Sequence, residues 1–522
     1  MKGKKIVSTL LALLLLANLP VSALAADWDI GSGDITVNAG SGGQTVTQGS
    51  QVDVPDSAPV IKGSSTKNTV TINAEKDQTA SVTLSGASID VSGKGKAAVS
   101  TTGEGNVSIE LDGENKLRSG EDHAGLEKNN GGSLTIADED KNGKLTAEGG
   151  KYGAGIGGGN KGNGDNIAIS GGDVKATGGT WGAGIGGGKN GAGSGITISG
   201  GEVEATGGSA GAGIGGGYEG DGSNITITDG KVTATGGYGG AGIGGGHQGA
   251  GSYITISGGE VKATGGKSGA GIGGGFKGNG NNIAITGGEV KATGGLNGAG
   301  IGCGLRGKGK DITVSGDAKL KVQGGGEDDY DGAGAGIGDG GSRDELAIPT
   351  PGAEVEPDTS GLTTNGSIEY YAPGADMEKD KPEKTTVGTL PPQEKPVEPI
   401  EPAVPEQPEA ERGMDAPLYR VTDKDGRDIV YTAEQKGGVL TVTVDADLAI
   451  LTGKLSSIDT LKRQGIEKIV FVTNKAASTF QAADLLEKGA SSDEYRLTHD
   501  GTTVTFVVSE KKTDVSGILI QP

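Results

Sequence analysis

Short runs of alternating apolar and polar residues recur through the first two thirds of the chain, with glycine-rich segments between them. Residues 224–228 (NITIT) and 231–235 (KVTAT) are two such runs, and a shorter Ala-x-Ile run lies within each glycine-rich segment. Alternation with a period of two predicts β-strands that bury one face. The predicted buried side chains of one such unit are Ala154, Ile156, Ile167, Ile169, Val174 and Ala176.

The three runs form a unit that repeats. The segment GAGIG recurs every 29 residues, and a seventh copy, at Ile337, follows after 36 residues. Blades of a β-propeller need about 40 residues each, so the shorter unit favours a three-sided parallel β-helix with one 29-residue coil per repeat. Adjacent coils would pair their backbones about 4.8 Å apart. This arrangement predicts one buried column of isoleucines: Ile156, Ile185, Ile214, Ile243, Ile272 and Ile301.

The pattern continues upstream in a less regular form. The intervals from Val99 to Leu126 and from Leu126 to Ile156 are 27 and 30 residues, close to the regular period. We therefore predict an all-β solenoid with degenerate coils and a cap first and regular coils afterwards. The predicted boundaries are 27–345 for the solenoid, 27–148 for its degenerate part and 149–345 for its regular part.

The first residues carry an export signal. Three lysines among the first five residues, an apolar run over residues 6–19 and the site ALA at 23–25 predict a secretory signal peptide over residues 1–25. The apolar run is shorter than the ~20 residues of a membrane-spanning helix. We expect a secreted protein, with association to a cell surface left open, and not an integral membrane protein.

Two further segments follow the predicted solenoid. Residues 346–415 hold most of the 17 prolines and many acidic residues, which predicts an extended, solvated linker. Its part around residues 368–371 could instead cover the open end of the solenoid. Residues 416–522 predict a small α+β domain of unknown function, with hairpins at 419–431 and 496–508 and helices at 456–464 and 478–488.

Composition narrows the function. With 107 glycines and 3% aromatic residues, the chain cannot fill a large globular core but suits a solenoid, in which glycines serve turns and close backbone contacts. The net charge of −21 argues against nucleic acid as a partner. Cys303 is the single cysteine, so neither a disulfide nor a multi-cysteine metal site is encoded.

No catalytic site is predicted. We expect His123, His247 and His499 to be solvated loop residues without partners, and the outward carboxylates and lysines of the strands to form a solvated charge ladder. A calcium β-roll is excluded because the carboxylate of Asp165 is not repeated in later coils. We expect no cofactor and assign no metal ligand, although isolated calcium sites in the degenerate coils stay open.

Aromatic residues in otherwise bare corners are the candidate ligand-binding residues. Tyr218, His247 and Phe276 each follow a repeat isoleucine by four residues, and Tyr152 and Trp181 each precede one by four. Equivalent positions of a solenoid stack, so we predict a stripe of three rings and a separate pair. Exposed rings beside polar groups suit sugars, whose C–H faces stack on the ring. The alternative is that these rings only pack the corners.

Several motifs in fixed order resemble one family. Residues 27–31 (DWDIG), 113–120 (GENKLRSG), 124–126 (AGL), 143–147 (GKLTA) and the GAGIGGG copies resemble secreted, Gly-rich repeat proteins of anaerobic gut-type Gram-positive bacteria, described as adhesin-like or carbohydrate-binding. The chain is also distantly similar to parallel β-helix carbohydrate-binding modules of plant-fibre-degrading clostridia. The first resemblance covers roughly residues 27–345, and both imply carbohydrate binding.

Three functions remain open from the sequence. The leading interpretation is a secreted or surface-associated, non-catalytic, adhesin-like protein that binds a polysaccharide or glycan of a host or bacterial surface. In the second, the solenoid is a stalk that presents the C-terminal domain. In the third, the degenerate coils form a polysaccharide lyase or hydrolase, where Asp112, Glu114, Glu121 and Asp122 lie close in sequence.

Overall fold

The computed structural model divides into two compact units, residues 1–397 and 398–522, and each is described by itself. The residues that the structure describes are 26–343, 348–389, 420–422, 424, 431–436, 439–444, 446, 448–463, 466–475, 477–486, 494–500, 503–508 and 511–512. The predicted signal peptide and the later part of the predicted linker lie outside the described residues.

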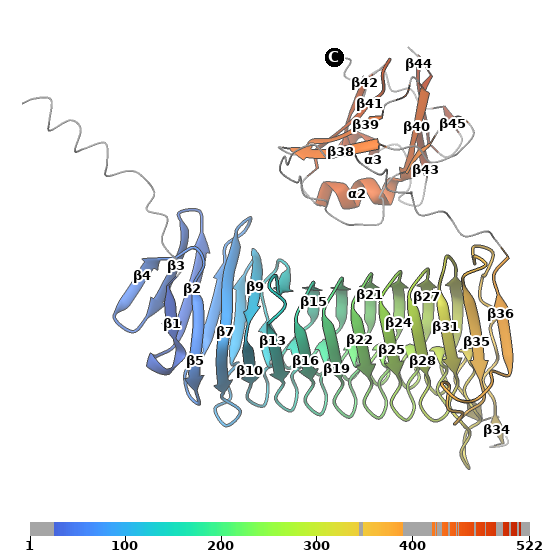
Figure 1. The fold of residues 1–522 in the computed structure, drawn as a ribbon, viewed down its shortest axis with the longest axis horizontal. Coiled ribbons are helices and arrows are strands. Elements are labelled where there is room, and N and C mark those ends of the chain that lie inside the picture. The colour runs from blue at the N-terminus through green and yellow to red at the C-terminus, as the bar shows by residue number, and fades with distance from the viewer. Residues whose placement is uncertain are drawn as a thin grey trace, which may run out of the picture. The chain divides into compact units, whose positions relative to one another are not determined.

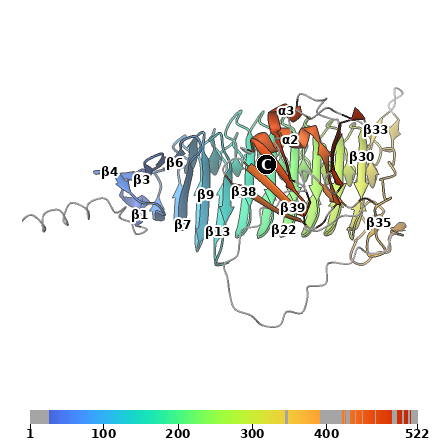
Figure 2. The same ribbon diagram turned by 90° about the horizontal axis from the view of Figure 1, so that it is seen from above.

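The first unit is a stack of coils (Figures 1 and 2), and each regular coil has three strands. In one coil these are β14 (Ile156–Gly157), β15 (Gly164–Ile169) and β16 (Asp173–Thr177). Each strand pairs in parallel with its counterpart 29 residues later. The three-sided parallel β-helix with 29-residue coils is thereby confirmed.

The same three strands recur through the regular region. The two-residue strands are β17 (Ile185–Gly186), β20 (Ile214–Gly215), β23 (Ile243–Gly244), β26 (Ile272–Gly273), β29 (Ile301–Gly302) and β32 (Ile337–Gly338). The second strands are β18 (Gly193–Ile198), β21 (Gly222–Ile227), β24 (Gly251–Ile256), β27 (Gly280–Ile285) and β30 (Gly309–Val314). The third strands are β19 (Glu202–Thr206), β22 (Lys231–Thr235), β25 (Glu260–Thr264), β28 (Glu289–Thr293) and β31 (Lys319–Gln323).

The core is a set of aliphatic columns inside the coils. The six repeat isoleucines pair in register from coil to coil, and each is fully buried. The predicted buried set of one coil, from Ala154 to Ala176, is likewise 0% exposed. The predicted isoleucine column is confirmed.

Glycine is needed at the regular corners because backbones of successive coils touch there. A Cβ atom on Gly266 would lie 1.4 Å from the carbonyl oxygen of Gly237 in the preceding coil. Gly244, on the outward side of its strand, has φ of +130°, which side chains rarely adopt. The repeated glycines therefore follow from the close approach of the coils.

The degenerate coils have the same parallel pairing, with strands of less uniform length. Strand β11 pairs with the earlier β8 and with the first regular short strand, β14. The elements of this region are β1 (Asp27–Asp29), η1 (Ile30–Ser32), β2 (Ile35–Gly40), β3 (Gly43–Gln48), β4 (Gln51–Pro55), β5 (Val60–Ser65), β6 (Val70–Ala74), β7 (Thr79–Asp90), β8 (Val99–Gly103), β9 (Asn106–Asp112), β10 (Glu114–Arg118), β11 (Leu126–Lys128), β12 (Leu134–Ala137) and β13 (Lys144–Glu148).

Antiparallel strands close both ends of the stack. At the N-terminal end β2, β3 and β4 pair antiparallel, as the predicted cap requires. At the C-terminal end β35 (Ser367–Tyr371) pairs in parallel with β31 and antiparallel with β36 (Lys384–Val387). A small hairpin, β33 (Ser342–Arg343) with β34 (Pro349–Thr350), lies beside them.

The predicted start of the linker at residue 346 is therefore wrong. Ile368 pairs with Leu320 and is fully buried, so this segment covers the end of the solenoid, as the alternative interpretation had it. The strands in residues 349–388 are only two to five residues long and lie among prolines and charged residues, so the sequence pattern did not predict them.

The second unit holds two sheets and two short helices among its described residues. One sheet has the order β37-β40-β43-β44-β45 and the other β38-β39-β41-β42. The predicted hairpin at 496–508 is present, but the strands at 419–431 belong to different sheets, and residues 477–481 form a strand where a helix was predicted. The elements are β37 (Arg420–Thr422), β38 (Tyr431–Lys436), β39 (Val439–Val444), β40 (Leu448–Lys454), α2 (Leu455–Arg463), β41 (Lys468–Val472), β42 (Ala477–Gln481), α3 (Ala482–Leu486), β43 (Glu494–Asp500), β44 (Thr503–Val508) and β45 (Lys511–Lys512).

Candidate functional site: an aromatic row and the groove at its end

The five predicted ligand-binding residues lie in the two corners that flank the short strands. The backbone N–H of Tyr218 donates a hydrogen bond of 2.8 Å to the carbonyl of Trp181, and the N–H of Phe276 donates one of 2.8 Å to Gly239. The corner that follows a short strand thus rests on the corner that precedes the short strand of the previous coil. Rings separated by 37 residues in sequence become neighbours.

The two predicted stripes therefore form one row. The ring centroids of Trp181 and Tyr218 lie 4.8 Å apart at an interplanar angle of 80°, and Tyr218 stacks on His247 at 5.4 Å and 20°. His247 and Phe276 follow at 5.0 Å and 35°. The separate pair predicted from sequence is wrong, because the offset of one coil between the two corners joins the pair to the stripe.

A lysine connects Tyr152 to this row. The Nζ atom of Lys189 lies 5.2 Å from the ring centroid of Tyr152 and 5.6 Å from that of Trp181. A cation between two ring faces is attracted to both. The row of five predicted residues is thereby continuous over the regular coils.

The rings of the row are half-buried rather than exposed. Small residues in the facing corner make room for them: a Cβ atom on Gly239 would lie 2.4 Å from Cδ2 of His247. Burial lowers the pKa of His247, which favours the neutral ring. Its Nδ1 atom is buried and has no hydrogen-bond partner among the described residues. Much of the row's surface is thus used for packing between coils.

A groove of about 440 Å³ opens where the row ends. Phe276 and His247 form one side, and the exposed rings of Tyr238 and Tyr330 also line it. Tyr330 lies in the long coil between Ile301 and Ile337, whose 36-residue interval provides a loop that the 29-residue coils lack.

A fixed ion pair contributes polar atoms to the same groove. Nε and Nη2 of Arg306 donate hydrogen bonds to the carboxylate of Asp331, at 2.9 to 3.1 Å. Asp331 is 5% exposed, and the side-chain amide of Asn297 donates to its carbonyl oxygen at 2.8 Å. Sequence analysis missed Tyr238, Tyr330, Arg306 and Asp331, although the unusual interval before Ile337 marked this coil.

The outward strand face carries the expected charge ladder. Lys144 pairs with Asp173 at 3.0 Å, and Lys231 pairs with Glu202 at 2.7 Å, in both cases one coil apart. Such exposed pairs are typical of a solvated sheet face.

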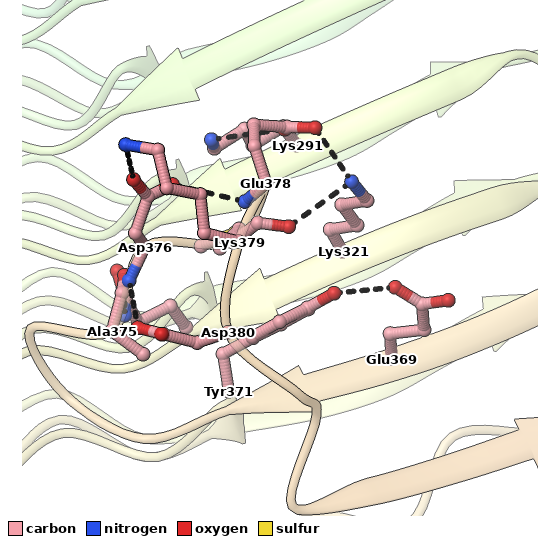
Figure 3. A network of polar contacts seen from close by, with 11 residues as sticks. Lys291, Lys321, Glu369, Tyr371, Ala375, Asp376, Glu378, Lys379 and Asp380 are labelled. Atoms are coloured by element: carbon pink, nitrogen blue, oxygen red, sulfur yellow. Dashed lines mark hydrogen bonds and ion pairs between the residues drawn. The ribbon is translucent and has the colours of Figure 1, made fainter.

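At the C-terminal end a cap loop completes this ladder (Figure 3). The carboxylate of Glu378 receives hydrogen bonds from Lys321 at 3.0 Å and from Lys291 at 3.3 Å, and these two bonds lower the pKa of Glu378. Several of the charges that border the adjacent hollow of about 590 Å³ already have counter-charges within the chain: Lys291 and Lys321 pair with Glu378, and Lys319 pairs with Glu289.

All three histidines differ from expectation in some respect. His123 is partly exposed in a loop, as predicted, but its Nδ1 lies 2.8 Å from Oε2 of the buried Glu127. The prediction of a solvated loop residue is wrong for His247, whose ring is half-buried between Tyr218 and Phe276. It is also wrong for His499, which is fully buried on β43 with Nε2 2.8 Å from Oγ of Ser478, because its partner comes from another strand.

The acidic residues proposed for a lyase site have different partners. Asp112 accepts from Ser85 Oγ at 2.6 Å, and Asp122 accepts from Asn160 at 2.8 Å. Glu114 and Glu121 pair with Lys116 and Lys151. Among the described residues, no three of these four carboxylates lie within 4.8 Å of one another.

Three carboxylates in the degenerate coils do form a cluster. Carboxylate oxygens of Glu110, Asp138 and Asp140 lie within 4.8 Å of one another, and burial, with the neighbouring acids, raises the pKa of Glu110. Calcium binding in the degenerate coils, which the sequence left open without assigning a ligand, is not tested by this cluster. Across the described residues, none of the helices is both long and apolar enough to span a membrane.

Comparison with known proteins supports the repeat assignment. No curated protein and no solved structure matches the chain, so the resemblance to adhesin-like and clostridial carbohydrate-binding proteins stays a prediction. Residues 141–160, 167–189, 196–218, 225–247, 254–276 and 283–305 match a family model described as Beta helix repeat. By this match and by the parallel pairing of its coils, the region from residue 141 to residue 305 consists of β-helix repeats.

Proposed function

We propose that this chain is a secreted or surface-associated, non-catalytic protein whose solenoid binds carbohydrate. The observation that carries the proposal is the row of aromatic side chains from the two corners that flank the short strands, which runs from Tyr152 to the groove beside Phe276. Sugar rings present C–H faces that stack on aromatic rings and hydroxyls that need hydrogen-bonding neighbours. Both kinds of group are present at the end of the row.

Binding rather than catalysis is favoured by the charged groups. Cleavage of a glycosidic bond by the usual mechanism requires two carboxylates that face the same bond. On the outward strand face several carboxylates pair with lysines one coil away, as Asp173 does with Lys144 and Glu202 with Lys231. This pairing accounts for them without a catalytic role.

A stalk is the second candidate function, and one observation favours it. The rings of the row are half-buried and contact one another, so corner packing alone would account for them. Residues 398–522 form a separate compact unit, which a stalk would present to its ligand.

A glycan array probed with the full chain tests the proposal. We expect binding to one or more glycans, and we expect a shortened chain that ends at residue 389 to retain it, because that chain keeps both end caps. Binding that requires residues 398–522 would establish the stalk instead. New reducing or unsaturated ends in the bound glycans would contradict a non-catalytic role, and sequencing the N-terminus of exported protein would test cleavage after Ala25.

A further inference from the structure

We propose that the groove beside Phe276 is the ligand-contacting part of the aromatic row, and that it binds neutral pyranose sugars. This inference rests on the proposed carbohydrate binding and assigns it to one place. Two exposed rings line the groove: Tyr238, from a regular coil, and Tyr330, from the longer coil that precedes Ile337.

The rings of the groove differ from those of the row in exposure. Tyr238 is 60% exposed and Tyr330 is 67% exposed, whereas the rings from Trp181 to Phe276 are half-buried against one another. Only an open ring face can stack on a sugar. The rings of the row therefore pack mainly against one another, and Tyr238 and Tyr330 present the ring faces on which a sugar can stack.

The polar side of the groove is rigid and presents donors and acceptors next to each other. The guanidinium of Arg306 is held by two nitrogens against Asp331, and Asn297 fixes the backbone of Asp331 and Gly332. Guanidinium nitrogens donate and carboxylate oxygens accept, so adjacent hydroxyls of a pyranose can each bond to one of them. Little reorganisation is needed on binding.

The charges of the groove nearly balance, with an excess of one positive charge, so we expect a neutral sugar to bind without needing an anionic group. Three cationic side chains, Lys267, Arg306 and Arg343, and two anionic ones, Asp328 and Asp331, line the groove. Arg306 is already neutralised by Asp331, and Lys267 lies 5.5 Å from the ring centroid of Tyr238. The volume of about 440 Å³ falls within the range of about 300 to 1,000 Å³ that small-molecule sites have.

The test is calorimetric titration of the full chain with cellohexaose, xylohexaose, mannohexaose and hexagalacturonate. The test variant is Tyr238→Ala combined with Tyr330→Ala. The matched control is Tyr253→Ala, because Tyr253 is also 60% exposed but lies on β24 and does not line the groove. Melting curves check that each variant is folded.

We expect a neutral hexasaccharide to bind, at least tenfold weaker binding by the double variant, and unchanged binding by the control. Unchanged binding by the double variant with loss in Trp181→Ala would overturn the groove assignment and leave carbohydrate binding intact. Binding of hexagalacturonate alone would overturn the preference for neutral sugars. If neither these probes nor the glycan array show binding, this inference fails together with the proposed function.

Discussion

The degenerate and the regular coils share one core but close their corners differently. In the degenerate coils buried polar side chains satisfy the backbone: Asn115 accepts from the N–H of Ala87 and donates to the carbonyl of Lys144. In the regular coils backbone meets backbone directly at nearly every corner, whereas in the degenerate coils such contacts occur at fewer glycines, among them Gly103 and Gly105. Ser268 is the only buried polar or charged side chain between residues 149 and 295, a stretch that the structure describes in full.

This difference explains why one region is repetitive in sequence and the other is not. A corner closed by side chains can be closed in many ways, because different donors and acceptors reach the same backbone groups. A corner closed by backbone contact admits only glycine, and every coil then needs it at the same position. The regular sequence of these coils follows because no residue other than glycine can close such a corner.

The largest expected effect comes from the core that both regions share. Ile243→Asp places a carboxylate without a partner among fully buried aliphatic side chains, and we expect a loss of more than about 3 kcal/mol of stability. The damage should spread to neighbouring coils, which depend on this coil for pairing. Thermal melting followed by circular dichroism measures it, with the outward Thr255→Asp on β24 of the same coil as control. An unchanged melting curve would refute the assignment of this column to the core.

The next largest effect is the difference in stability between a glycine substitution in a regular corner and one in a degenerate coil. Gly266→Ala brings a Cβ atom to within 1.4 Å of a backbone oxygen, so the coils must move apart, at a cost of about 3 kcal/mol. Gly93→Ala in a degenerate coil has no atom within 4 Å of its Cβ and should leave stability nearly unchanged. Denaturant unfolding of both variants gives the comparison, and equal effects would contradict the proposed reason for the repeated glycines.

The polar corners of the degenerate coils should tolerate loss of a side chain less well than their irregular sequence suggests. Glu127 accepts hydrogen bonds from the N–H of Ala124 and from Asn129 while 6% exposed. Glu127→Ala leaves these donors unsatisfied, and we expect a loss of about 2 kcal/mol. The exposed Glu121→Ala is the control in the same denaturant series. Equal stability of the two variants would show that the corner does not depend on this carboxylate.

The smallest effect concerns pH within the regular region. Burial lowers the pKa of His247 below its ordinary value of 6.5, with Glu219 opposing and Lys277 reinforcing the shift. The unfolded chain therefore binds the proton more readily, so the stabilising contribution is complete above pH 6.5 and decreases as the pH falls below it. His247→Phe, which matches Phe276 in the next coil, should flatten the dependence of melting temperature on pH between 7 and 5. The same slope in both proteins would contradict this.

Sequence reasoning was strongest where local pattern and global fold coincide. Alternation and the 29-residue period were enough to predict the strands and the column from Ile156 to Ile301, because each coil repeats the same inward set. The joining of Trp181 to Tyr218 could not be predicted from spacing within one coil, since it depends on which corner of one coil rests on which corner of the next.

The remaining errors arose where the period is broken. The groove depends on a loop that occurs in one coil. Tyr330 and Asp331 have no equivalents in the other coils, so the repeat pattern could not point to them. The segment around Ile368 has the prolines and charges of a linker, yet a few buried side chains, among them Leu362 and Tyr371, and pairing with the edge of β31 place it in the solenoid. Free edges recruit strands, and sequence alone does not show where an edge is free.

Because antiparallel strands close each end of the solenoid separately, the number of regular coils between the ends can change, and with it the length of the solenoid. Because every regular coil pairs with its neighbours in the same register, removing or duplicating 29 residues between β16 and β20 leaves both ends and the groove unaltered. Each such change would alter the distance between the N-terminal end and the groove by about 4.8 Å. The number of regular coils thus sets the distance between the N-terminal end and the groove in steps of one coil.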